Sequence, residues 1–198
     1  MRQSRKMPAE KRRSQLLKAA ARIFGRKGYT RATTEDIARA AKLTKGSLYF
    51  HFKSKEDIFL AVIKEHHKDH MDVIMGIIRS EKDPLISIEK SIRALLDVHE
   101  KFRYITPVFW QQAASIPVVR NYMKEQHDAL QNEVVHYLMD VADMKKKDAE
   151  MLFTVLHTSI DGMILHISGG IPKFARETFI QSMMIVVKPF LNENKSKR

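Results

Sequence analysis

The sequence contains no cysteine, and its 198 residues include only seven glycines, six prolines and one tryptophan. The lack of cysteine excludes disulfides, thiolate metal clusters and thiol nucleophiles, and it fits a reducing compartment, so we expect a cytoplasmic protein. Long apolar runs are also missing, because the longest is the six residues from Ile58 to Ile63. A membrane-spanning helix needs about 20 such residues, so the sequence predicts no membrane partner.

Acidic residues are scarce in one part of the chain. Residues 1–55 hold 16 Lys and Arg against 3 Asp and Glu, a net charge of +13, whereas residues 56–198 hold 19 against 20, a net charge of −1. A chain that needs charge only for solubility would spread it evenly. This concentration favours a polyanionic partner, either nucleic acid or an anionic membrane surface.

Strand signals are weak, and apolar residues recur at helical spacing almost everywhere, so we expect an all-α protein. The spacing predicts a first helix over residues 9–27 that ends at Gly28, because glycine favours the left-handed conformation past a helix end. Thr33 or Thr34 begins a short second helix, and Asp36 completes an imperfect capping box. A third helix covers residues 45–52, and Ser54 caps a long fourth one. Further helices are expected over residues 85–102, 107–115, 118–143, 147–168 and 172–192.

Two short helices joined by a three-residue turn, with a first helix behind them, indicate a helix-turn-helix domain. Residues 44–55 contain no acidic residue that would repel phosphates. Leu48 and Phe52 lie four apart and are expected to face the core. We therefore predict a DNA-binding domain over residues 1–57 and a second helical domain over residues 58–198, with the fourth helix spanning the boundary.

The run from Thr33 to Ala38, the run from Lys45 to Phe52 and the following Lys55 resemble the signature of TetR-family transcriptional regulators. The resemblance covers about residues 12–62. It implies a homodimer whose third helices enter successive major grooves of a palindromic operator in double-stranded DNA. It also implies a variable C-terminal domain that binds a small effector and thereby lowers DNA affinity, most often in a repressor.

The resemblance assigns a role to each matching position. Thr34, Thr44, Tyr49, His51 and Lys55 match positions that mostly touch phosphates, and Lys45, Gly46, Ser47 and Phe50 match positions that approach base edges. Arg2, Arg5 and Lys6 form a possible basic arm. The family usually has glycine where this chain has Lys42, so the resemblance implies a strain of about 1 kcal/mol at that turn. Lys42 could instead add a phosphate contact.

Two C-terminal segments carry apolar stripes at helical spacing. The interpretation as intrachain core competes with a four-helix dimer interface, which the resemblance favours. The stripe residues are Leu152, Leu156, Ile160, Met163, Ile167, Ala175, Phe179, Met183, Val187 and Phe190.

The middle of the chain supplies aromatic, flexible apolar and a few polar residues that suit a pocket for an apolar or aromatic effector, although any core contains such residues. The candidates are Phe102, Tyr104, Phe109, Trp110, Met123, His127, Leu130, Phe153 and His157. His66 and His70 lie four apart, which is an acceptable spacing for metal ligands, but solvent-facing histidines are the simpler interpretation. His99 is isolated in the sequence, which indicates a packing or surface residue.

Three other functions are alternatives to an effector-released repressor. A metal-responsive regulator would use His66 and His70. An architectural DNA-binding protein would show little preference among sequences. An enzyme is disfavoured because no nucleophile elbow, phosphate-binding glycine loop or His-Glu-x-x-His helix occurs, and the sequence points to no cofactor.

Overall fold

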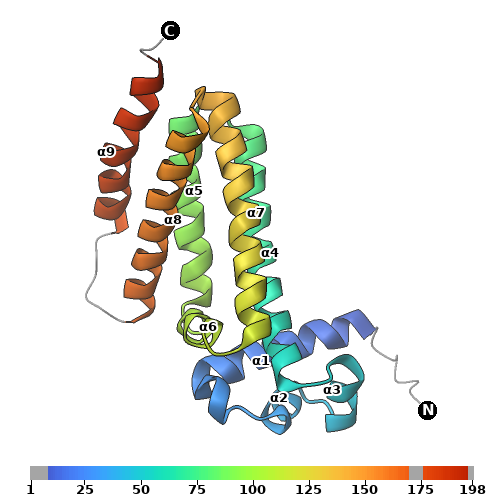
Figure 1. The fold of residues 1–198 in the computed structure, drawn as a ribbon. Helices are drawn as coiled ribbons and strands as arrows, with labels where there is room; N and C mark the ends of the chain where they lie inside the picture. The colour runs from blue at the N-terminus through green and yellow to red at the C-terminus, as the bar shows by residue number, and fades with distance from the viewer. Residues whose placement is uncertain (1–8, 170–175, 196–198) are drawn as a thin grey trace, which may run out of the picture.

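The computed structural model of the protein describes residues 9–169 and 176–195, and within them every regular element is a helix. The all-α prediction is therefore confirmed. In chain order the helices are α1 (Ala9–Arg31), α2 (Thr34–Ala40), α3 (Lys45–His51), α4 (Lys55–Ser80), α5 (Pro84–Phe102), α6 (Thr106–Ala113), α7 (Pro117–Ala142), α8 (Lys146–Ser168) and α9 (Arg176–Lys195). Helices α1 to α3 gather at one end, and the long helices extend away from them as a bundle (Figure 1).

Side-chain caps set the helix starts in the first domain. The Thr33 hydroxyl accepts a hydrogen bond from the Asp36 N–H at 3.1 Å, and the Asp36 carboxylate accepts one from the Thr33 N–H at 3.2 Å, so the capping box is complete. Thr44 caps α3 by accepting from the Ser47 N–H, and Ser54 caps α4 by accepting from the Asp57 N–H. Because these bonds are local in sequence, the starts of all three helices could be predicted.

Three described residues have positive φ, namely Gly28, Lys42 and Asp143, and the sequence indicated the first two. Gly28 has φ of 71°, but helical structure resumes after this kink and continues to Arg31, beyond the predicted end of the first helix. Lys42 has φ of 53° in the turn between α2 and α3. A side chain in this left-handed conformation costs about 1 kcal/mol, which glycine would avoid.

Two apolar clusters hold the described part of the chain together. The first joins α1, α2, α3 and the start of α4 to α6. At its centre, the Phe59 ring lies 5.1 Å from Phe24 and 5.7 Å from Phe109, both edge to face. The second cluster lies between α5, α7, α8 and α9. Helices α1, α2 and α3 thus share one apolar core with α6 at the near end of the bundle.

The predicted dimer stripe lies mostly inside the protomer, and this corrects the sequence interpretation. Leu152, Leu156, Ile160, Met163, Met183 and Val187 are buried in the second cluster, Ile167, Phe179 and Phe190 pack partly buried against it, and Ala175 lies outside the described residues. A side chain already buried by its own chain has no surface left for a second copy. Periodicity identifies an apolar face, but it does not reveal which molecule covers that face.

A different set of apolar residues is exposed on α8 and α9, at one side of the molecule (Figure 1). These residues are Met151, Val155, Leu165, Ile185 and Val186. Within the described residues, α8 is the one helix whose length and mean hydropathy of 1.2 would suit a membrane span. Only 33% of that stretch is buried in the protomer, so α8 carries more apolar surface than its own chain covers.

Candidate nucleic-acid interface and effector cavity

Helix α3 presents an acid-free surface at the end of the molecule away from the bundle (Figure 1). Leu48 and Phe52 are 0% and 5% exposed, so they anchor α3 on the core as the spacing predicts. Phe50 is 81% exposed and Tyr49 46% exposed. Lys42, Thr44, Lys45 and Gly46 are also exposed, and Thr34, Ser47 and His51 are half-buried. An aromatic ring as free as that of Phe50 is poorly placed for packing and well placed to contact a partner.

A small polar network links the starts of α2 and α3. The hydroxyls of Thr34 and Tyr49 lie 3.2 Å apart, and the Thr34 hydroxyl donates to the Glu35 carboxylate at 3.1 Å. Glu35 also pairs with Lys45, and the hydrogen bond from Lys45 lowers the pKa of Glu35. The sequence interpretation missed this acidic neighbour. Both partners are at least half exposed, so the ion pair is weak and Lys45 can exchange Glu35 for a phosphate or a base.

Lys55 has a different environment from the one its predicted phosphate contact requires. Its ammonium donates to the carbonyl oxygens of Tyr29 at 3.0 Å, Ala32 at 3.2 Å and Thr30 at 3.3 Å. It also lies 4.5 Å from the centre of the Tyr29 ring. All three N–H groups thus have acceptors at the end of α1, so Lys55 ties α4 to α1 in this structure. The predicted basic arm of Arg2, Arg5 and Lys6 lies outside the described residues.

A cavity of about 450 Å³ lies inside the bundle between α4, α5, α6, α7 and α8. This volume is in the range of small-molecule sites. Six of the predicted pocket residues line it, namely Phe109, Trp110, Met123, His127, Leu130 and His157. Phe102 and Tyr104 instead line a separate groove between α1 and α4, and Phe153 lines a neighbouring cavity of about 80 Å³. The three misplaced residues lie on other faces of their segments.

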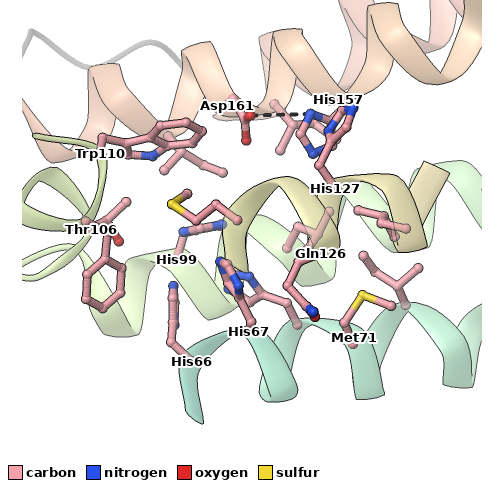
Figure 2. A pocket seen from close by; sticks show the side chains of 18 of the residues that line it. His66, His67, Met71, His99, Thr106, Trp110, Gln126, His127, His157 and Asp161 are labelled. Carbon is pink, nitrogen blue, oxygen red and sulfur yellow. Dashed lines mark ion pairs between the residues drawn. The ribbon is translucent and has the colours of Figure 1, made fainter. Parts of the chain in front are cut away.

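Four histidines line the same cavity, namely His66, His67, His70 and His99. Figure 2 shows His66, His67 and His99 beside it. The solvent-facing interpretation of His66 and His70 is therefore wrong, whereas His99 takes the packing alternative that was left open for it. Burial lowers the pKa of His66 to about 3, of His70 to about 2, and of both His67 and His99 to about 4. The imidazoles are accordingly neutral at pH 7.

A second polar group stands on the opposite wall, on α7 and α8 (Figure 2). His157 Nδ1 lies 3.4 Å from an Asp161 carboxylate oxygen, and the His157 ring lies 4.8 Å from the His127 ring. Burial lowers the pKa of His157 to about 4 and raises that of Asp161 to about 6. The contact is therefore no ion pair at neutral pH, because the imidazole is uncharged. The cavity thus carries polar groups on two opposite walls, while most of its lining is apolar.

Residues 16–62 match the family model described as bacterial regulatory proteins of the tetR family. This segment comprises most of α1, all of α2 and α3, and the start of α4, where the predicted signature lies. Over these residues the chain is similar to the tetR family. The match agrees with the resemblance given by the run from Lys45 to Phe52 and its neighbours.

Relatives extend the similarity beyond the reading helices. The chain is 32% identical over 99 residues to the transcriptional activator FasR of Mycolicibacterium smegmatis, which is 50% of this chain and 45% of FasR. It is 26% identical over 167 residues to the transcriptional repressor AcnR of Corynebacterium diphtheriae, covering 80% and 82% of the two chains. The chain thus matches less than half the length of FasR. A crystal structure from Saccharomonospora viridis in complex with choline shares the fold, with a TM-score of 0.77, 19% identity and coverage of 90% and 96%.

Proposed function

We propose that this protein is a sequence-specific DNA-binding transcriptional regulator that represses from a palindromic operator and is released by a small-molecule effector. The observation that carries the proposal is the acid-free surface of α3, where Phe50 is 81% exposed on a domain with a net charge of +13 over residues 1–55. Lysines and arginines neutralise phosphates, while the front of α3 offers side chains for base edges. Repression is proposed because AcnR, a relative matched over most of the chain, is a repressor.

Reading a palindrome requires two copies of α3 about 34 Å apart, and hence a dimer. We propose that the second copy covers the exposed apolar residues of α8 and α9. Met151, Val155 and Leu165 lie along one face of α8, and Ile185, 72% exposed, lies on α9. The same patch on both copies would give an isologous interface. Such a partner accounts for the membrane-like composition of a helix of which only 33% is buried in the protomer.

The cavity lies where it can influence the spacing of the two reading helices. Helix α4 runs from Lys55, directly after α3, into the wall of the cavity. Phe109 lines the cavity and contacts Phe59 at 5.7 Å between ring centres, and Phe59 packs on Phe24 in the first domain. An effector that binds more tightly when the two α3 helices of the dimer are not spaced for DNA would favour that state. It would weaken DNA binding by the ratio of its affinities for the two states. A coupling of about 1–3 kcal/mol gives a roughly 5- to 150-fold change.

Selection of bound fragments from random DNA by the purified protein tests the proposal. We expect a palindromic consensus that competes more than about 1,000-fold better than random DNA in a gel shift, as specific regulators do. A preference below about tenfold would instead identify an architectural DNA-binding protein. Compounds of apolar or aromatic character are then screened for release of the selected fragment. A protein that binds its palindrome but is released by none of them would refute the proposed effector class.

A further inference from the structure

Three imidazoles from two helices meet at one corner of the cavity. His66 and His70 are one turn apart on α4, and their ring centres lie 4.1 Å from each other. The ring of His99, from α5, lies 4.3 Å from His70 and 5.5 Å from His66. One ring nitrogen from each residue lies within 4.8 Å of the other two. Figure 2 shows His66 and His99 on neighbouring helices beside the same space.

Each of these residues has a buried nitrogen that lacks a hydrogen-bond partner among the described residues. The atoms are Nδ1 of His66, Nε2 of His70 and Nδ1 of His99. His66 is only 4% exposed. His67, beside them, has an unpartnered Nδ1 as well. Buried polar atoms in native proteins nearly always have partners, so this group of unpartnered nitrogens around one end of the cavity indicates that something else binds there.

The kind of ligating atom determines which metal ion can bind. Three nitrogens bound to one tetrahedral ion at about 2.05 Å are about 3.3 Å apart. Small movements of the rings would bring the three histidine nitrogens to this spacing. Neutral imidazoles suit zinc, nickel, cobalt and copper ions, whereas Mg²⁺ and Ca²⁺ require oxygen ligands. His67 is not part of the set, because its ring is 6.2 Å from both His66 and His70 and stacks on Tyr122. We propose that His66, His70 and His99 form a site for a zinc-like divalent transition-metal ion, with its fourth position open to the cavity.

Binding of such an ion would regulate the DNA affinity of the protein, an inference that rests on the proposed function. It would fasten α4 to α5 next to the first domain, because the His66 ring lies 4.5 Å from Phe102 and 5.4 Å from Phe109. Phe109 belongs to the apolar cluster that also holds α1 to α3. Drawing His66 and His70 toward His99 would therefore move the helix that begins immediately after α3.

Direct metal binding is tested first, on the tag-free full chain after chelation. Calorimetric titration with Zn²⁺ is expected to give one ion per chain, and Co²⁺ should show the visible absorption of a four-coordinate site. His70→Gln and His99→Gln should each weaken binding by more than about 100-fold, beyond the 10- to 100-fold effect of residues that only support a ligand. His136→Gln is the control for surface histidines, because His136 is exposed on α7, and it should leave the titration unchanged. Thermal unfolding of each metal-free variant shows whether it folds.

Absence of binding, or equal affinity in folded His70→Gln and His99→Gln variants, would overturn the site. The regulatory step has a separate readout, the gel-shift affinity for the selected DNA with and without Zn²⁺. We expect at least a fivefold change, abolished in the His70→Gln variant. Metal binding without an effect on DNA would refute the regulatory step and leave the site standing. Metal binding by a protein that selects no DNA would refute the proposed function alone.

Discussion

Replacing Lys55 by methionine separates two roles for this residue. Methionine keeps most of the aliphatic length but removes the three hydrogen bonds to the carbonyls of Tyr29, Thr30 and Ala32 and the contact with the Tyr29 ring. A hydrogen bond to a charged group contributes about 1.5–3 kcal/mol when buried. These carbonyls are only partly buried, and water can replace part of what is lost. We therefore expect the free energy of unfolding to fall by about 2 kcal/mol.

For a chain of this size, 2 kcal/mol corresponds to a decrease in Tm of about 4–8 °C, measured by circular dichroism at a fixed protein concentration. Lys53→Met is the matched control, because Lys53 is an exposed lysine two residues away, and its Tm should change little. The dependence of DNA affinity on salt should have the same slope in the Lys55→Met variant as in the parent. An unchanged Tm together with a slope reduced by about one would refute the structural role of Lys55 and restore the phosphate contact.

Ile185→Glu places a charge on the exposed face of α9, and sedimentation should show a shift from dimer to monomer; a dimer of unchanged affinity would contradict the proposed interface. Gly25→Ala should lower the free energy of unfolding by about 1–2 kcal/mol, because the new Cβ would lie 2.5 Å from the Tyr104 ring and 2.7 Å from its carbonyl oxygen, and equal stability in urea would show that α1 and Tyr104 separate freely. Asp161→Asn should raise stability by about 1–2 kcal/mol at pH 7.5 but hardly at pH 4. Because burial raises the folded pKa from 3.8 to about 6, the destabilisation by this carboxylate develops between these pH values and is complete above pH 6, so an equal effect at both pH values would argue against a buried charge. Lys42→Gly should stabilise by up to about 1 kcal/mol in the same urea assay, and a loss would mean that the Lys42 side chain outweighs its backbone strain.

The first domain could be predicted almost completely because its signals are local. Thr33, Thr44 and Ser54 each accept a hydrogen bond from the N–H three positions on. Thr33 and Ser54 begin the helices that they were expected to begin, and Thr44 caps the helix that was expected to start at Lys45. The concentration of positive charge and the exposed front of α3 also follow from short stretches of sequence. The sequence by itself therefore determined where α3 lies and which family it resembles.

Tertiary structure decided which neighbour each side chain meets. Periodicity identified apolar faces on α8 and α9, but only packing showed that Leu152 and Val187 lie in the protomer core while Ile185 remains exposed. The sequence assigned Lys55 to a phosphate contact, whereas in the folded protein its ammonium donates to three carbonyls at the end of α1. His99 acquires its relation to His66 and His70 only because α5 packs beside α4. Contacts between distant segments depend on how whole helices pack, and no single stretch of sequence contains that information.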